Sequence, residues 1–323
     1  MDSENWIDLA VAACDDAGVE HGPIEIVMTW DQKFSDSDAY RNSAIFRIGG
    51  QRCLKLYGPT AAGERPFHAE RSVLRTLAEY NSAIPAPRLI AARERSQLLP
   101  YLIMTEITGT TVEDSWKTLT RAEQLAIARE IGTITAAIHC LPQEDLAEVE
   151  RQFGGRREYA KLMQTERIAQ IKATGRLSVR QRDALLHYLT GEAQNFLDEP
   201  PKLTHSDFSH AHIYIARETD TVKVTGFIDW AEAMLGPPEW DIAFHWFWTF
   251  TRDREAMREC LGAFYPDGQL PERFARRCLN THLYSFSMGE LWPYFAEKVV
   301  KSESIVREMT AFFFPPDVFG PSD

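Results

Sequence analysis

Residues 203–215 of this chain read Leu203-Thr204-His205-Ser206-Asp207-Phe208-Ser209-His210-Ala211-His212-Ile213-Tyr214-Ile215, and after a short polar turn a second β-prone run ends at Ile228-Asp229-Trp230. Two such runs around a turn predict an antiparallel hairpin. The start of its first strand lies beside the end of its second, so His212 and Asp229 should meet there. Asp207, on the loop that enters the hairpin, should lie close to both.

These three side chains form a minimal set for metal-assisted phosphoryl transfer. Asp207 would orient an acceptor hydroxyl and accept its proton, while His212 and Asp229 would hold Mg²⁺ against the phosphates of a nucleotide. Histidine and aspartate also serve in loops as caps and turn formers. The prediction therefore depends on their joint spacing and not on any one residue.

The pattern of apolar residues changes at about residue 107. Before it, short β-rich runs at 24–28, 44–48, 52–56 and 99–104 are separated by Gly, Pro and Asp. After it, apolar residues recur at helical spacing, most clearly at 125–138 and 183–197. We predict an α+β protein with a small antiparallel β lobe (1–107) and a larger, mainly helical lobe (108–323). The aromatic-rich segment 240–250 should be mostly helix core.

One helix is expected within the β lobe. Pro66 suits a first helical turn, and Glu70 falls at helical spacing between Phe67 and Leu74, on an apolar stripe. A carboxylate there either reaches water at the edge of the stripe or pairs with a buried cation. Lys55, on the strand predicted at 52–56, is the candidate cation.

The amino-acid composition limits the kinds of molecule that this protein is expected to bind. The chain has 35 Lys and Arg against 47 Asp and Glu, a net charge of −12, which disfavours nucleic acid and anionic membranes and favours cationic small molecules. Its five cysteines never form C-x-x-C, and the amino terminus is acidic where a signal peptide is basic. No apolar stretch reaches the roughly 20 residues of a membrane span. We therefore expect a cytoplasmic protein.

Together these motifs resemble the aminoglycoside phosphotransferase family, the antibiotic and choline kinases that share the protein kinase fold. The family's catalytic segment is H-x-D, four residues, then Asn or His, and its metal segment is a hydrophobic residue followed by I-D-W/F. His205, Asp207, His212 and Asp229 stand at these places. The resemblance implies a protein kinase-like bilobal fold, with His205 and Asp241 bracing the catalytic loop.

The resemblance also implies a nucleotide site for ATP or GTP. Lys55 and Glu70 match the strand lysine and helix glutamate that grip the α- and β-phosphates. Glu106 and Ile107 match the hinge where adenine bonds to backbone, and Ser43 belongs to the loop that covers the phosphates.

Two departures from the family pattern bear on these roles. His212 stands where most members carry Asn, as in macrolide kinases and kinases of the 2″-hydroxyl of aminoglycosides, and imidazole is a less usual Mg²⁺ ligand than an amide oxygen. The phosphate-covering loop, 35–43, contains no glycine. In contrast, the Asp229-Trp230-Ala231-Glu232 segment resembles that of hygromycin B kinases. In this chain, Glu232 would contact either the substrate or the catalytic loop.

We expect an acceptor that is a small molecule with a hydroxyl group, a cationic antibiotic such as an aminoglycoside (hygromycin-like or 2″-type). A macrolide, or a metabolic alcohol such as choline or homoserine, stays open, as does the choice between monomer and homodimer. Two other classes are a metal-dependent hydrolase, which leaves Lys55 and Glu70 unexplained, and a kinase-fold binder without catalysis.

Overall fold

The computed structural model describes residues 3–29, 43–58, 61–80, 83–94, 98–143, 146–151, 154–173, 175, 177–191, 197–284 and 304–322. The glycine-free segment 35–42 lies outside these residues. The strands are β1 (Ile24–Met28), β2 (Ser43–Ile48), β3 (Arg52–Tyr57), β4 (Leu89–Arg93), β5 (Tyr101–Thr105), β6 (Thr110–Thr111), β7 (Lys202–Thr204), β8 (Ile213–Glu218), β9 (Thr221–Phe227) and β10 (Met234–Gly236).

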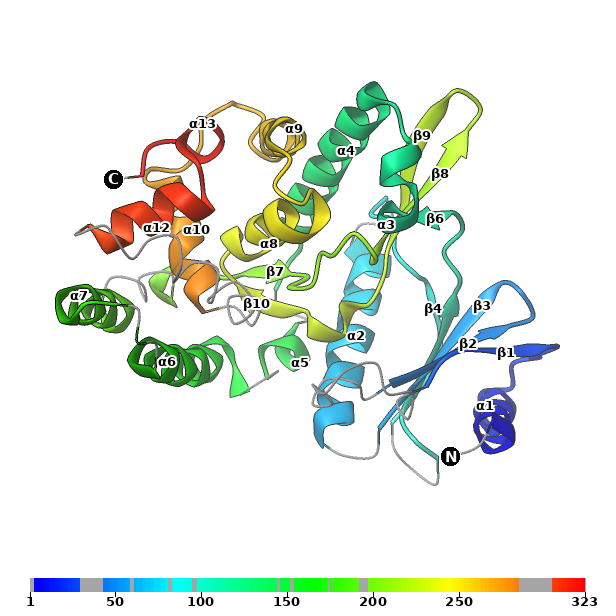
Figure 1. Ribbon diagram of the computed structural model, residues 1–323. Helices are drawn as coiled ribbons and strands as arrows, with labels where there is room; N and C mark the ends of the chain where they lie inside the picture. The colour runs from blue at the N-terminus through cyan, green and yellow to red at the C-terminus, as the bar shows by residue number, and fades with distance from the viewer. Residues whose placement is uncertain are drawn as a thin grey trace.

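Helices make up most of the second half of the chain (Figure 1). They are α1 (Ser3–Ala17), α2 (Ala61–Tyr80), α3 (Val112–Ser115), η1 (Trp116–Thr118), α4 (Arg121–His139), α5 (Ala147–Glu150), α6 (Arg156–Ala173), α7 (Val179–Thr190), η4 (Trp230–Glu232), α8 (Glu239–Phe244), η5 (His245–Thr249), α9 (Arg254–Phe264), α10 (Phe274–Leu283), α12 (Ile305–Phe313) and α13 (Pro316–Phe319).

The small lobe is a five-stranded antiparallel sheet in the order β1-β2-β3-β5-β4. Because side chains alternate along β3, Leu54 and Leu56 pack with Trp6 of α1, whereas Lys55 and Tyr57 bond to Glu70 of α2. Helices α1 and α2 lie on opposite sides of the sheet (Figure 1). The predicted β lobe with its helix is confirmed. Neither α1 nor β4 was predicted.

The start of α2 was predicted wrongly. The helix begins at Ala61, five residues before Pro66, and therefore contains this proline. Its first turn lies close against the end of β3, since a Cβ added to Gly63 would collide with the backbone of Gly58. Glycine thus permits a close approach here. Tertiary packing, which local proline preference does not reveal, sets the start of the helix.

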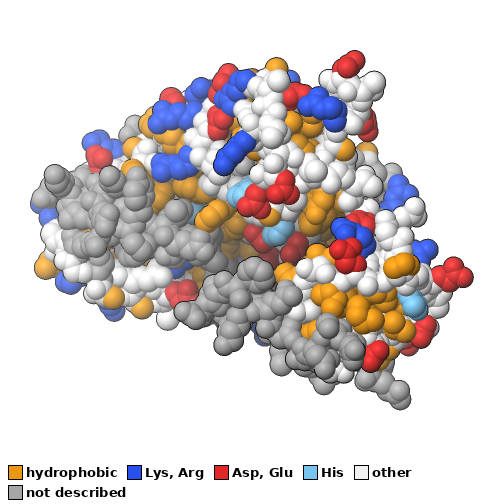
Figure 2. All heavy atoms as spheres, turned by 45° about the vertical axis from the view of Figure 1, so that its right-hand side comes forward, with side chains coloured by type: hydrophobic (Ala, Val, Ile, Leu, Met, Phe, Trp, Pro, Cys, Tyr) orange, Lys and Arg blue, Asp and Glu red, His pale blue; other side chains and the backbone are white. Residues whose placement is uncertain are grey.

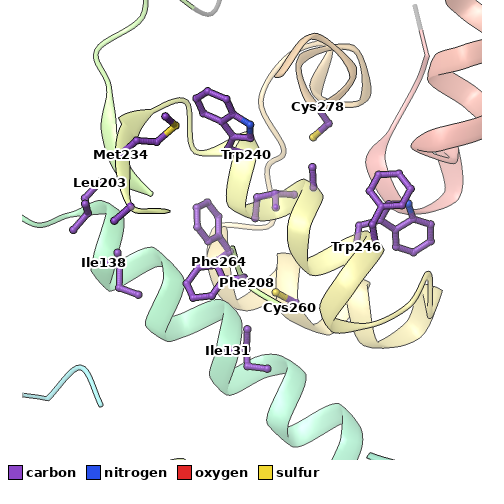
Figure 3. Packing of buried hydrophobic residues seen from close by; sticks show 14 of the residues in the cluster. Ile131, Ile138, Leu203, Phe208, Met234, Trp240, Trp246, Cys260, Phe264 and Cys278 are labelled. Carbon is purple, nitrogen blue, oxygen red and sulfur yellow. The ribbon is translucent and has the colours of Figure 1, made fainter. Parts of the chain in front are cut away.

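The large lobe contains the predicted hairpin, in which β8 and β9 pair antiparallel with Ile213 opposite Phe227. Its core is built around α4, which begins with a capping box between Thr120 and Glu123. Helix α4 lies close against α9, because Gly132 leaves room for the backbone of Cys260 (Figure 3).

The aromatic-rich segment is mostly core, as expected. The side chains that are buried there are Trp240, Trp246, Phe247 and Phe250. Phe244 and Trp248 are half-buried against the same core. The segment forms α8 and then the short π-helix η5.

The helix predicted at 183–197 begins four residues earlier than expected, and residues 192–196 of that prediction lie outside the described part of the chain. Helix α7 spans Val179–Thr190, because Ser178 and Gln181 form a capping box at its start and Gly191 follows its last residue. Among the described residues, no helix is both long enough and apolar enough to cross a bilayer.

Candidate active site

The loop that carries Asp207 is anchored from beneath by a buried carboxylate. Asp241 accepts hydrogen bonds from the backbone N–H groups of His205 (3.1 Å) and Ser206 (2.9 Å), as expected for a bracing residue. His139 Nε2 lies 2.9 Å from the same carboxylate. Sequence reasoning missed this third partner, because His139 lies 102 residues away from Asp241 along the chain.

His205 braces the loop through a neutral ring. It accepts from the Asp207 backbone N–H at Nδ1 (3.3 Å) and donates from Nε2 to the Ile228 carbonyl (3.0 Å). Burial lowers the pKa of His205 to about 4, so the ring is uncharged at neutral pH. It also stacks on Phe208 at 4.3 Å between centroids. These contacts suit a residue that orients the loop.

His212 lies between two carboxylates. Its Nδ1 donates to the Asp207 carbonyl (2.9 Å) and is 3.4 Å from Asp207 Oδ2, while its Nε2 is 3.8 Å from Asp229 Oδ2. The Ile228 N–H donates to the His212 carbonyl (3.0 Å), which closes the open end of the hairpin. The hairpin register predicted this meeting.

The electrostatics of these residues are coupled. Burial raises the pKa of Asp207 to about 6, with His212 opposing and Asp229 adding to the shift. Burial lowers the pKa of His212, but Asp207 and Asp229 outweigh it, and the pKa is raised overall. Asp207 is therefore a stronger base than an exposed aspartate.

Lys55 links the two lobes. Its Nζ donates to Glu70 Oε2 (2.8 Å) on α2 and to Asp229 Oδ1 (2.6 Å) after β9. Burial disfavours the Lys55 charge, but Asp229 and Glu70 overcome it and raise the pKa of the lysine. Burial likewise opposes the charge on Asp229, yet Lys55 and His212 lower the pKa of its carboxyl. The predicted Lys55–Glu70 pair is thus present, and Lys55 also contacts Asp229.

Glu70 has two further partners that were not predicted. The Tyr57 hydroxyl donates to Oε2 (2.5 Å), and the Trp230 backbone N–H donates to Oε1 (3.3 Å). The position of Tyr57, two residues after Lys55 on a strand, was a usable signal, because it puts both side chains on one face. Trp230 follows Asp229 directly, so Glu70 also restrains the segment that carries this aspartate.

Glu106 and Ile107, the predicted hinge residues, follow directly after β5. The Glu106 backbone N–H donates to the Gln51 carbonyl (2.9 Å), and its carboxylate accepts from Arg47 (2.6 Å). Ile107 packs on Gly226, where any Cβ would collide with it. Ser43 is the first residue of β2 and stands opposite Tyr57.

Two polar groups at the site have no hydrogen bond within the described part of the chain. Glu232 is half-buried, and burial, with repulsion from Asp229 and Asp207, raises its pKa to about 7. The indole Nε1 of Trp248 is buried and unpaired. Nearby, His210 bonds to the Trp248 carbonyl and lies 3.1 Å from Glu113. Figure 2 shows acidic and histidine side chains gathered in a hollow of this face, beside hydrophobic ones.

Asp229 and His212 are the side chains that suit a metal. Asp229 Oδ1 is taken by Lys55, whereas Oδ2 faces His212 Nε2. Two protein ligands fit Mg²⁺, which usually completes its octahedral shell with water and substrate phosphates. In the described residues, no group of three or more His, Cys, Asp and Glu side chains could hold a metal by itself.

Comparison with known proteins identifies the class that this site and fold define. The sequence profile of the phosphotransferase enzyme family (APH) matches residues 35–275, and the chain belongs to this family. Hygromycin-B 4-O-kinase of Escherichia coli is 25% identical over 218 residues, which are 63% of this chain and 58% of that enzyme. The match thus spans less than two thirds of the relative's length.

Solved structures share the bilobal fold. The GDP complex of wild-type aminoglycoside 2'-phosphotransferase-IIIa aligns with a TM-score of 0.66 and 14% identity, covering 98% of both chains. Macrolide 2'-phosphotransferase MphH from Brachybacterium faecium aligns with a TM-score of 0.56 and 17% identity, covering 98% of this chain and 99% of its own. The predicted α+β, kinase-like architecture is confirmed.

Proposed function

We propose that this protein is an O-phosphotransferase that moves the γ-phosphoryl group of ATP or GTP to a hydroxyl of a cationic antibiotic, an aminoglycoside of the hygromycin-like or 2″ type. The observation that carries the proposal is the position of Lys55 Nζ, 2.8 Å from Glu70 and 2.6 Å from Asp229, beside the Asp207–His212 pair. A metal-dependent hydrolase would leave the pairing of Lys55 with Glu70 unexplained.

The reaction is a direct in-line transfer. Asp207 orients the acceptor hydroxyl and takes its proton as the oxygen forms a bond to the γ-phosphorus and the bond from that phosphorus to the β–γ bridging oxygen breaks. The nucleoside diphosphate leaves with the bridging oxygen. Lys55, held by Glu70, offsets the charge of the phosphates. No covalent enzyme intermediate is required.

Asp229 and His212 would hold Mg²⁺, which when bound neutralises phosphate charge and aligns the leaving group. The hydrogen bond from His212 Nδ1 to the Asp207 carbonyl leaves Nε2 directed toward Asp229. Asp229 is the stronger of the two ligands, because Mg²⁺ prefers oxygen.

The nucleotide base would bind at the hinge between a nucleotide-binding lobe (1–107) and an acceptor-binding lobe (108–323). The Glu106 N–H is already occupied by Gln51, so the Glu106 carbonyl and the backbone of Ile107 are left for the base. Ser43, at the start of β2, would donate to the phosphates.

A cationic acceptor is supported by the charge of the site. Glu232 and Glu113 lie near Asp207 and His210, and the chain carries a net charge of −12. The identity to Hygromycin-B 4-O-kinase also favours an aminoglycoside. The half-buried Trp248, whose indole N–H has no partner among the described residues, would suit a sugar ring.

The test is nucleotide consumption by the purified protein with Mg²⁺ and either ATP or GTP, across aminoglycosides, macrolides, choline and homoserine. We expect turnover that requires an aminoglycoside and is lost in Asp207→Asn, which still binds nucleotide. Turnover only with a macrolide or a metabolic alcohol would replace the acceptor class. Nucleotide binding without turnover on any acceptor would favour a silent binder, and absence of nucleotide binding would reject the kinase.

A further inference from the structure

Glu70 receives more donors than its pairing with Lys55 requires. Its Oε2 accepts from both Lys55 Nζ (2.8 Å) and the Tyr57 hydroxyl (2.5 Å), and Oε1 accepts from the Trp230 N–H (3.3 Å). Glu70 is 1% exposed and Tyr57 is fully buried. A charged carboxylate in this environment is stable only because each oxygen is satisfied.

Tyr57 is held rigidly. It lies on the central strand β3, and its ring packs edge-on against Phe67 of α2 at 5.5 Å between centroids. Lys55 Nζ lies 5.4 Å from the centroid of the same ring. Burial and the neighbouring Glu70 raise the pKa of the phenol, so it remains a donor. The hydroxyl therefore fixes the position of Oε2 against both the sheet and the helix.

This position matters because Lys55 is shared. Its shorter bond is to Asp229 (2.6 Å), and the bond to Glu70 is longer (2.8 Å). Nucleotide phosphates would add a third anion that competes for the same ammonium group. A fixed Glu70 would keep Lys55 at the level of the phosphates, whereas a mobile carboxylate would let it swing to Asp229.

We propose that Tyr57 is a positioning residue for nucleotide binding, which acts through Glu70 by fixing the oxygen that orients Lys55. This inference rests on the proposed function, because it assumes that Lys55 binds nucleotide phosphates. It adds a role for a residue that touches neither the nucleotide nor the acceptor.

The experiment compares Tyr57→Phe with Tyr101→Phe. Tyr101 is a matched control: it is also buried in the same sheet and donates to a carboxylate, Asp16 (2.6 Å), but it packs with α1 on the opposite face. Both variants lose one hydrogen bond to a charged group, and both should lower Tm by a few degrees. If the role of Tyr57 is only structural, this lower Tm should be the only effect of Tyr57→Phe.

Dissociation constants for Mg·ATP and Mg·GTP are measured by titration calorimetry without acceptor, where the stoichiometry separately reports the folded fraction. Tyr57→Phe should raise Kd about five- to tenfold, and Tyr101→Phe should change it less than about twofold. The KM for the acceptor should be unchanged in both. In a Glu70→Gln background, Tyr57→Phe should add less than about a twofold effect, because both act through one carboxylate.

Wild-type affinity in Tyr57→Phe, or an equal loss in Tyr101→Phe, would overturn the inference and leave the proposed function intact. An undiminished Tyr57→Phe effect in the Glu70→Gln background would also overturn it. If the wild-type protein binds neither nucleotide, the proposed function fails and this inference fails with it.

Discussion

Lys55 and Arg277 are both cations that bind two carboxylates, and they differ in whether a carboxylate oxygen is left without a bond to the cation. Arg277 of α10 donates from Nε to Glu239 (2.6 Å) and from both terminal nitrogens to the two oxygens of Glu199 (2.6 Å each). Lys55 donates once to Glu70 and once to Asp229, whose Oδ2 is free of it. In the arginine cluster (Arg277, Glu199 and Glu239), all three guanidinium nitrogens are bound to carboxylates, which suits a purely structural role. In the lysine cluster (Lys55, Glu70 and Asp229), one carboxylate oxygen of Asp229 is left for a ligand. We call the first cluster closed and the second open.

Donor geometry explains the difference. A guanidinium presents its N–H groups in a fixed planar fork, which two carboxylates can saturate. An ammonium group is a compact charge with three donors that rotate together, so it can exchange one anion for another. The choice of cation at each place thus agrees with a tie in the large lobe and a binding group at the lobe interface.

The largest effect is expected at Asp207, the proposed base, which lies beside the lysine cluster. Asp207→Asn keeps the shape of the side chain but cannot accept the acceptor proton, so kcat should fall about 10³- to 10⁴-fold. Steady-state rates at saturating nucleotide measure it. The Kd for nucleotide should change little, and retention of more than a tenth of the wild-type kcat would contradict the assignment of the base.

The closed cluster should respond in stability. Arg277→Met leaves the carboxylate of Glu239, which is 1% exposed, without its cation, and such a loss typically costs about 3–5 kcal/mol of unfolding free energy. Urea unfolding measures it. The double variant Arg277→Met/Glu239→Gln should recover much of the loss, because no buried charge is left unpaired. A lower kcat per folded molecule in either variant would show that the cluster is not purely structural.

Asp229→Asn tests the open side of the lysine cluster. The amide keeps one oxygen but removes the charge that would bind Mg²⁺ and that attracts Lys55, so kcat/KM for Mg·nucleotide should fall about 100-fold. The loss should be reduced at high Mg²⁺. His212→Asn, which restores the amide common in the family, serves as the comparison and should lower kcat/KM by less than about tenfold. Equal losses of kcat/KM in the two variants would indicate that Asp229 and His212 contribute equally to metal binding.

The smallest effect concerns His245, in the core beneath the catalytic loop. It bonds to Thr135 (2.9 Å) and Thr249 (3.0 Å), and burial lowers its pKa to about 3 from an ordinary 6.5. Below pH 6.5 the unfolded chain therefore binds a proton that the folded chain excludes, and stability is lost as pH falls toward 3. One such group costs about 1.4 kcal/mol per pH unit in this window.

His245→Asn removes this proton-linked loss. Urea unfolding at pH 6.0 and 5.0 should show a shallower decline in the variant than in the wild type, by about one proton. The variant is less stable at pH 7, since it loses the stacking on Phe208 (4.6 Å between centroids). The same slope in both proteins would indicate that His245 is protonated in the folded state.

The comparison of the two clusters also marks how far sequence reasoning reached. The meeting of His212 with Asp229 was predictable, because an antiparallel hairpin converts spacing along the chain into neighbours in space. The Lys55–Glu70 pair was one of two interpretations that the strand position and the helical stripe left open, and the resemblance to the family favoured it. Arg277 was not singled out, since one arginine on a helix resembles any other until the positions of Glu199 and Glu239 are known.

Errors arose where packing overrode local preference. Pro66 suggested a helix start, yet the close approach of Gly63 to Gly58 lets α2 begin earlier. His139 was not singled out in the sequence, yet the fold brings it to Asp241. Likewise, Trp248 could not be separated from the other aromatic residues of its segment, because only the packing of the described residues shows that its indole N–H has no partner among them.

The sequence by itself determined the α+β class of fold, the hairpin that carries the candidate site and the chemical types of the side chains that meet there. These follow from periodicity and spacing, which act over a few residues. Only the tertiary structure decided which charges are shared and which are closed off, as when Asp229 meets Lys55 across 174 positions of the chain. Such partners depend on how lobes and helices pack, because burial strengthens or forbids a charge according to every group around it.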